Sequence, residues 1–145
     1  MLSKDFKEFV ALLNAHGVKY LIVGGYAMAL HGRPRNTGDL DVWIASTPDN
    51  ARKLLNALEA FGFGGLGLTQ ADFESPDQVV QLGYPPFRID LLTAIDGVPF
   101  QAAWPRRETL THDGLTLQFI GLDDLKTNKR ASARPRDIDD LEQLP

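Results

Sequence analysis

Cysteine is absent from the 145-residue sequence, which excludes disulfide bonds and metal sites built on thiolates. Long apolar runs are absent too. None approaches the ~18 residues that a membrane-spanning helix needs, so we expect no contact with a membrane. The first residues place acids among apolar positions and lack a small-residue cleavage site. We therefore expect no signal peptide and a cytoplasmic location.

The sequence also lacks a surplus of positive charge. Lysine and arginine number 15 against 19 aspartates and glutamates, which gives a net charge of −4. General attraction to nucleic acid is therefore not expected, and any such contact requires a local basic patch. The composition, 43% hydrophobic and 23% charged, is that of a globular protein, and the length is that of one domain. Since there is no repeat or linker, we expect a single domain over residues 1–145.

Helical and strand patterns alternate along the chain. Amphipathic spacing and capping signals predict helices, whereas alternating or continuous apolar runs predict strands. Several connections are too short for right-handed crossovers, so we expect an α/β (α+β) fold with a mixed sheet and helices packed on it. The expected strands cover residues 20–23, 39–44, 79–82, 87–92, 108–111 and 115–120. The expected helices cover residues 5–16, 26–31, 48–61, 69–74, 100–104, 122–133 and 138–144.

Two aspartates stand two positions apart in the second expected strand. Asp39 and Asp41 would point to the same face of the sheet, because side chains alternate along a strand. Like charges this close raise each other's pKa and destabilise the fold unless something compensates. Mg²⁺ is a natural compensating ion because it prefers carboxylate oxygens. An edge strand facing water is the alternative explanation for the pair.

Two more features favour the metal interpretation. Gly24 and Gly25 follow a buried strand and precede a helix whose N–H groups and dipole favour an anion such as phosphate, although a plain tight turn explains the same pair. Asp90 lies in an apolar strand and would share its outer face with Arg88. A third carboxylate on a neighbouring strand completes a two-metal ligand set. The alternative is a surface ion pair between Arg88 and Asp90.

Together these residues resemble the signature of the nucleotidyltransferase superfamily. The match consists of Val23-Gly24-Gly25, a spacer of thirteen residues and Asp39-Leu40-Asp41-Val42. Asp90 with its apolar neighbours matches the third carboxylate of that signature. The longer string VGGYAMALHGRPRNTGDLDVW, with RIDLLT and NKRASARPRDIDDL, is similar to small bacterial nucleotidyltransferases grouped with AbiEii-type toxins. The resemblance covers about residues 17–141.

The resemblance implies a nucleotidyltransferase-type sheet with tail helices, about residues 122–144, packed on it. It also implies an enzyme that transfers a nucleoside monophosphate from a nucleoside triphosphate (NTP) to RNA or protein. Asp39, Asp41 and Asp90 would be the catalytic set and hold two Mg²⁺ ions, which steady the attacking and leaving oxygens. Gly24 and Gly25 would contact the phosphates. The protein would be a candidate toxin of a toxin–antitoxin pair, with an antitoxin or a second copy as partner.

A basic segment lies near the end of the sequence. It contains Lys126, Lys129, Arg130, Arg134 and Arg136 and no acid. Two explanations account for this segment about equally well. It forms a clamp for triphosphate or RNA, or it is a solvated helix face that pairs with the acidic helix that follows. The resemblance places Lys129 in the tail motif, so we expect Lys129 to contact the nucleotide.

A second basic pair, Arg33 and Arg35, lies in the loop before Asp39. These arginines either reach phosphate or offset the carboxylates, and a cationic loop beside a metal site often does both. We expect Arg35 to belong to the nucleotide site.

Two other functions stay open. A nucleotidyltransferase fold that has lost catalysis would bind nucleotide or a protein partner, and a structural protein would bind no ligand. The complete set of Asp39, Asp41 and Asp90 argues against loss, because uncompensated clustered carboxylates are costly. The structural protein would require the glycine pair and all three aspartates to be coincidental.

Overall fold

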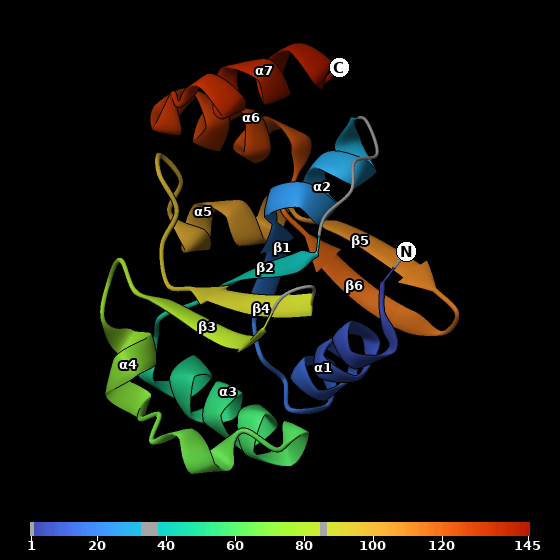
Figure 1. Ribbon diagram of the computed structural model, residues 1–145. Helices are drawn as coiled ribbons and strands as arrows, with labels where there is room; N and C mark the ends of the chain where they lie inside the picture. Colours follow the sequence, from blue (N-terminus) through green and yellow to red (C-terminus); the bar gives the residue numbers. More distant parts are fainter. Residues whose placement is uncertain (1, 33–37, 85–86) are drawn as a thin grey trace.

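A mixed six-stranded sheet forms the centre of the molecule (Figure 1). The computed structural model describes residues 2–32, 38–84 and 87–145. The strand order is β3-β4-β2-β1-β6-β5. Strands β1–β6 and β2–β4 pair in parallel, and β1–β2, β3–β4 and β5–β6 pair antiparallel. The strands are β1 (Tyr20–Val23), β2 (Asp39–Ile44), β3 (Val79–Tyr84), β4 (Phe87–Leu92), β5 (Glu108–His112) and β6 (Leu115–Phe119).

Helices cover both faces of this sheet (Figure 1). One face carries α1 (Lys4–Ala15), α3 (Pro48–Phe61) and α4 (Gln70–Glu74). The other carries α2 (Gly24–His31), α5 (Phe100–Ala103), α6 (Leu122–Ser132) and α7 (Pro135–Gln143). Short 3₁₀ turns, η1 (Gly64–Leu66) and η2 (Trp104–Arg106), follow α3 and α5. None of the helices within the described ranges is long and apolar enough to cross a membrane.

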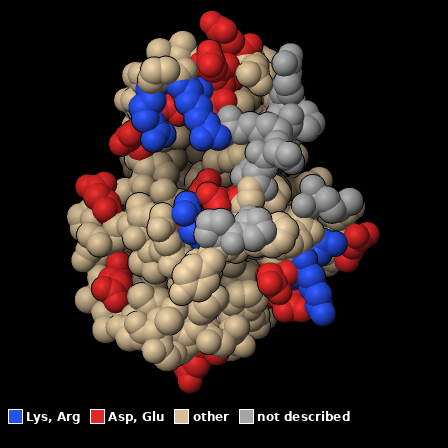
Figure 2. Space-filling model, in the orientation of Figure 1, with Lys and Arg blue, Asp and Glu red and all other residues tan. Residues whose placement is uncertain are grey.

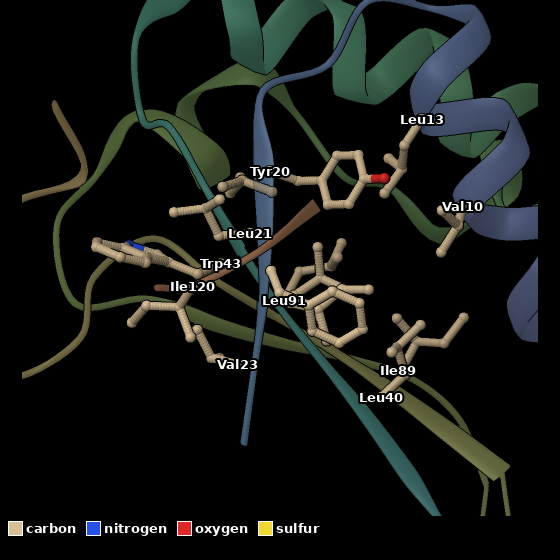
Figure 3. Packing of buried hydrophobic residues seen from close by; sticks show 14 of the residues in the cluster. Val10, Leu13, Tyr20, Leu21, Val23, Leu40, Trp43, Ile89, Leu91 and Ile120 are labelled. Atoms are coloured by element: carbon tan, nitrogen blue, oxygen red, sulfur yellow. The ribbon is translucent and has the colours of Figure 1, made fainter. Parts of the chain in front are cut away.

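The core is divided between the two faces by strand alternation. Leu40 and Val42 of β2 are fully buried, whereas Asp39 and Asp41, which alternate with them, point to the opposite face. Burying such side chains stabilises the fold by about 1.5–3 kcal/mol each. Figure 3 shows the core on each side of the strands. Val10, Leu13, Tyr20, Leu40 and Ile89 lie on one side, and Leu21, Val23, Trp43 and Ile120 lie on the other.

The mixed sheet confirms the expected fold class, and the helix boundaries match the expected ones to within one residue except at the starts of α2 and α7. Helix α2 begins at Gly24, two residues earlier than expected, so the glycine pair forms its first turn. Helix α7 begins at Pro135 instead of Ile138. Proline fits the first helical position, because its missing N–H has no partner there and its φ is already helical.

Side-chain contacts fix α6 above the sheet. Arg106 makes two hydrogen bonds to Asp124, with Nε 3.1 Å from Oδ2 and Nη2 2.8 Å from Oδ1. Asn128 Nδ2 donates to the carbonyl oxygen of Asp96 at 3.0 Å, and Ser132 Oγ donates to the Asp96 carboxylate at 2.9 Å. These bonds hold α6 against η2 and against the loop that follows β4, beside the carboxyl-bearing face.

Candidate active site

Three carboxylates meet on one face of the sheet because of its register. Strands β2 and β4 pair in parallel, and Asp41 lies opposite Asp90 while Asp39 lies opposite Arg88. Since alternate residues of a strand share a face, all four of these side chains point the same way. The structure therefore brings together the three aspartates that the sequence singled out.

Asp41 lies at the centre of the cluster and has a perturbed pKa. Burial, together with the charges of Asp90 and Asp39, raises the pKa of the Asp41 carboxyl to about 6. Arg88 opposes this rise but does not cancel it. Adding a divalent cation would lower the free energy of this group in its ionised form.

Arg88 provides positive charge within the cluster. Its Nη2 lies 3.1 Å from Oδ2 of both Asp39 and Asp90, and its Nε lies 2.8 Å from Oδ1 of Asp90. The hydrogen bonds that Arg88 donates to Asp90, with the nearby negative charges, raise the pKa of Arg88 above its ordinary value. Arg88 therefore occupies the position between Asp39 and Asp90, and it does more than form the simple surface pair that the sequence left open.

Gly24 is where the glycine pair and the aspartate pair meet. Its φ of +69° lies in the left-handed region that favours glycine. A Cβ at this position would lie 2.9 Å from Cγ of Asp41 and still closer to Oδ2 of the same side chain. Val23, the residue before it, pairs with Asp41 across β1 and β2. Gly24 thus leaves room for the carboxylate as well as for the turn into α2.

The carboxylates open into a cleft below the tail helices. A cavity of about 270 Å³ is lined by Gly24, Gly25, Asp39 and Asp41 from the sheet side and by Lys129, Arg134 and Arg136 from the tail. A second cavity of about 310 Å³ shares Gly24, Asp41, Lys129 and Arg134 with the first and extends towards Asp96. Figure 2 shows a hollow with Lys and Arg side chains along its upper rim and acidic side chains at its floor.

Lys129 lines this cleft and is also paired with α7. Its Nζ lies 2.8 Å from Oδ2 of Asp140 and 3.4 Å from Oδ1 of Asp137, and all three residues are buried. Arg134 Nε donates to Oδ2 of Asp137 at 2.8 Å. Burial alone would raise the pKa of Asp137, but the hydrogen bonds from Arg134 and the charge of Lys129 hold it below its ordinary value. The pairing of the basic segment with the acidic helix is present, although Lys129 is buried and not solvated.

The site residues that the sequence predicted differ in where they lie relative to the cleft. Gly24, Gly25, Asp39, Asp41 and Lys129 line the cleft. Asp90 is buried beside Asp41 and lines neither cavity, and Arg33 and Arg35 lie outside the described residues. Sequence reasoning did not place Arg88 between two carboxylates. The one signal available was its position two residues before Asp90, on the same strand face.

The donor set fits Mg²⁺ in its chemistry. Carboxylate oxygens are the ligands that this hard cation prefers, and the raised pKa of Asp41 reflects its burial together with the negative charges of Asp90 and Asp39. Across residues 2–32, 38–84 and 87–145, however, no three acidic, histidine or cysteine side chains are already arranged around one metal position. Binding a cation at Asp39 and Asp90 would require the Arg88 guanidinium to move aside.

Comparison with known proteins shows the family of this chain and agrees with its fold. The chain belongs to the family described as nucleotidyltransferase of unknown function (DUF6036), which it matches over residues 2–144. Among curated proteins, none matches the sequence.

Three solved structures have similar folds. A Thermotoga maritima protein assigned as a nucleotidyltransferase has a TM-score of 0.60 at 12% identity, over 94% of this chain and 86% of that one. An antigenic nucleotidyltransferase-like protein of Paracoccidioides brasiliensis has a TM-score of 0.57 at 22% identity, over 98% and 76%. ANT(2″)-Ia, solved in complex with adenylyl-2″-tobramycin, has a TM-score of 0.55 at 12% identity, over 95% and 84%. At these identities the likeness is one of fold.

Proposed function

We propose that this protein is a Mg²⁺-dependent nucleotidyltransferase that moves a nucleoside monophosphate from an NTP to a hydroxyl group of an RNA or protein acceptor. The observation that carries the proposal is the convergence of Asp39, Asp41 and Asp90 on one sheet face, directly beside the left-handed Gly24. The family membership supports a transferase. The adenylylated product in the ANT(2″)-Ia structure is an example of such chemistry on a similar fold.

In the proposed reaction, the acceptor oxygen bonds to the α-phosphorus, the bond between the α-phosphorus and its bridging oxygen breaks, and pyrophosphate leaves. Asp39, Asp41 and Asp90 would hold two Mg²⁺ ions, which would activate the acceptor and neutralise the phosphates when bound. Asp90 would lie nearest the acceptor and take its proton. The first turn of α2 at Gly24 and Gly25 would direct its N–H groups to the phosphates.

Nucleotide binding tests the site without knowledge of the acceptor. The thermal stability of the protein would be measured with each NTP, with and without Mg²⁺, for the wild type, Asp39→Asn and the control Asp49→Asn, which removes an exposed carboxylate on α3. A ligand at a hundred times its dissociation constant stabilises by ~2.7 kcal/mol. We expect a Mg²⁺-dependent increase in Tm for the wild type and the control that Asp39→Asn lacks. No increase with any NTP, or an equal increase in all three proteins, would contradict the proposed site.

Arg88 favours a second candidate, an inactive module that binds nucleotide or a protein. Its hydrogen bonds to Asp39 and Asp90 occupy ligand positions that catalysis would need. Incubation with α-³²P-labelled NTPs, Mg²⁺ and a cell extract distinguishes the two. Covalent labelling of RNA or protein by the wild type but not Asp39→Asn supports the enzyme, and Mg²⁺–NTP binding without labelling supports the module.

We also propose that the protein acts as the toxin of a toxin–antitoxin pair. A cytoplasmic enzyme of this kind, with an antitoxin or a second copy as partner, would modify an essential RNA or protein of the host cell. Growth arrest on expression of the wild type but not Asp39→Asn would support it, and normal growth with demonstrated transferase activity would exclude it under those conditions.

A further inference from the structure

The cleft above the carboxylates has opposite charges on its two walls. Asp39 and Asp41 line the sheet side of the cavity of about 270 Å³. Three cations, Lys129, Arg134 and Arg136, line its tail side together with one carboxylate, Asp137, which Lys129 and Arg134 pair with. The negative charge of a metal-bound triphosphate would lie on the side of the metal that faces away from the carboxylates. It therefore needs cationic donors on the wall that faces them.

The three cations of that wall differ in how their charge is already used. Lys129 is buried and paired with both Asp137 and Asp140. This Lys129 pairing leaves its ammonium group little capacity for a further anion, because two carboxylates already neutralise it. Lys129 is thus better suited to fixing α7 on α6 than to binding phosphate.

Arg134 and Arg136 are in the opposite situation. Arg134 uses Nε to bond Asp137, and its side chain is 75% exposed while lining both cavities. Within the described part of the chain, its two Nη groups have no hydrogen-bond partner, and Arg136 makes no ion pair. A guanidinium group with unused N–H donors is a strong, geometrically matched phosphate ligand.

We propose that Arg134 and Arg136 bind the β- and γ-phosphates of the nucleotide, and that Lys129 is a positioning residue that holds them over the carboxylates. This assignment rests on the proposed function and adds the residues that recognise the triphosphate. It places the phosphates between the first turn of α2 and the start of α7, with the α-phosphate towards Asp39, Asp41 and Asp90. It also moves the nucleotide contact expected of Lys129 to its two neighbours on the cavity wall.

The test compares variants of equal charge change. Arg136→Gln is the main variant, because Arg136 has no ion pair in the described structure to lose, and Arg134→Gln is the second. Arg130→Gln on α6 is the control, because Arg130 is exposed and lines neither cavity. Binding of ATP, AMP and inorganic tripolyphosphate would be measured in Mg²⁺ by calorimetry, and Tm would be recorded for each variant to confirm folding.

We expect both arginine variants to weaken binding of ATP and tripolyphosphate about tenfold or more, since each loses charge-assisted hydrogen bonds. AMP binding and the Arg130→Gln variant should change little. An equal loss in all three variants would indicate general electrostatic attraction and overturn the assignment. So would unchanged tripolyphosphate binding, including the case in which only an RNA oligonucleotide binds more weakly.

Adding Asp39→Asn to the same experiment separates this inference from the proposed function. If Asp39→Asn abolishes ATP binding while Arg134→Gln and Arg136→Gln bind normally, the carboxylate site stands and the arginine assignment fails. If the wild type binds neither ATP nor tripolyphosphate in Mg²⁺, both fail.

Discussion

Replacing Gly24 by alanine separates two reasons for the glycine. The left-handed φ of +69° would strain any side chain by about 1–2 kcal/mol. The new Cβ would also lie 2.9 Å from Cγ of Asp41, so that carboxylate must rotate away. Turning this half-buried side chain out of its preferred rotamer costs about 1 kcal/mol more. We therefore expect Gly24→Ala to destabilise the protein by about 2–3 kcal/mol, because the two costs add.

Gly67 provides a matched control for this substitution. Its φ of +72° is nearly the same, and a Cβ there would meet nothing within 4 Å. Gly67→Ala should therefore cost only the backbone strain. At about 3 °C per kcal/mol, the expected decreases in Tm are about 3–6 °C for Gly67→Ala and about 6–9 °C for Gly24→Ala.

Mg²⁺-dependent NTP binding should distinguish Gly24→Ala from Gly67→Ala more sharply than the loss of stability does. The rotated Asp41 carboxylate would no longer face Asp39 and Asp90, so Gly24→Ala should lose the Mg²⁺-dependent stabilisation by NTP. Gly67→Ala should retain it. Differential scanning fluorimetry of both variants, with and without Mg²⁺–NTP, measures both effects. Equal decreases in Tm together with equal nucleotide stabilisation would refute the claim that Gly24 makes room for Asp41.

Three further predictions concern charges at the site. Asp41, with its pKa raised to about 6 in the folded state, binds its proton more tightly there than in the unfolded chain. In EDTA the free energy of unfolding of the wild type should therefore fall by about 1–3 kcal/mol relative to that of Asp41→Asn as the pH rises from about 4 to 6. Urea denaturation across this pH range measures the difference, and parallel pH profiles of the two proteins would contradict the prediction. Lys129→Ala removes the ammonium group from two buried carboxylates, of which Asp137 keeps its hydrogen bonds from Arg134, and should cost about 3–5 kcal/mol in denaturant unfolding. A second substitution, Asp140→Asn, should recover part of that loss, and a loss below about 1 kcal/mol would show that the pairing does not hold α7. Arg88→Gln should lower Tm in EDTA and shift the Mg²⁺ titration of Tm to lower concentration, and an unchanged titration would show that Arg88 does not compete with the cation.

The carboxylate face could be predicted from local sequence because strand geometry is local. Alternation along 39–44 fixes Asp39 and Asp41 on one face whatever the rest of the chain does. The apolar neighbours of Asp90 do the same for β4. Which strands lie side by side depends on the whole fold, and the sequence alone does not determine that Asp41 stands opposite Asp90.

Contacts between distant segments could not be predicted in this way. The need for glycine at position 24 arises from Asp41, on the neighbouring strand, and a local pattern records only a tight turn. Lys129 is one of several basic residues on a helical face, and its burial depends on how α7 crosses α6. The start of α7 at Pro135 then decides that Arg134 and Arg136 border the cleft.

A crystal structure of the protein with Mn²⁺ and a non-hydrolysable NTP analogue tests the central claim most directly. The anomalous signal of manganese locates the ions without reference to any assumed chemistry. We predict manganese peaks beside Asp39, Asp41 and Asp90, the triphosphate across the cleft from them, and the Arg88 guanidinium displaced from its present hydrogen bonds. Nucleotide bound elsewhere, or an aspartate cluster without manganese and still bonded to Arg88, would contradict the account.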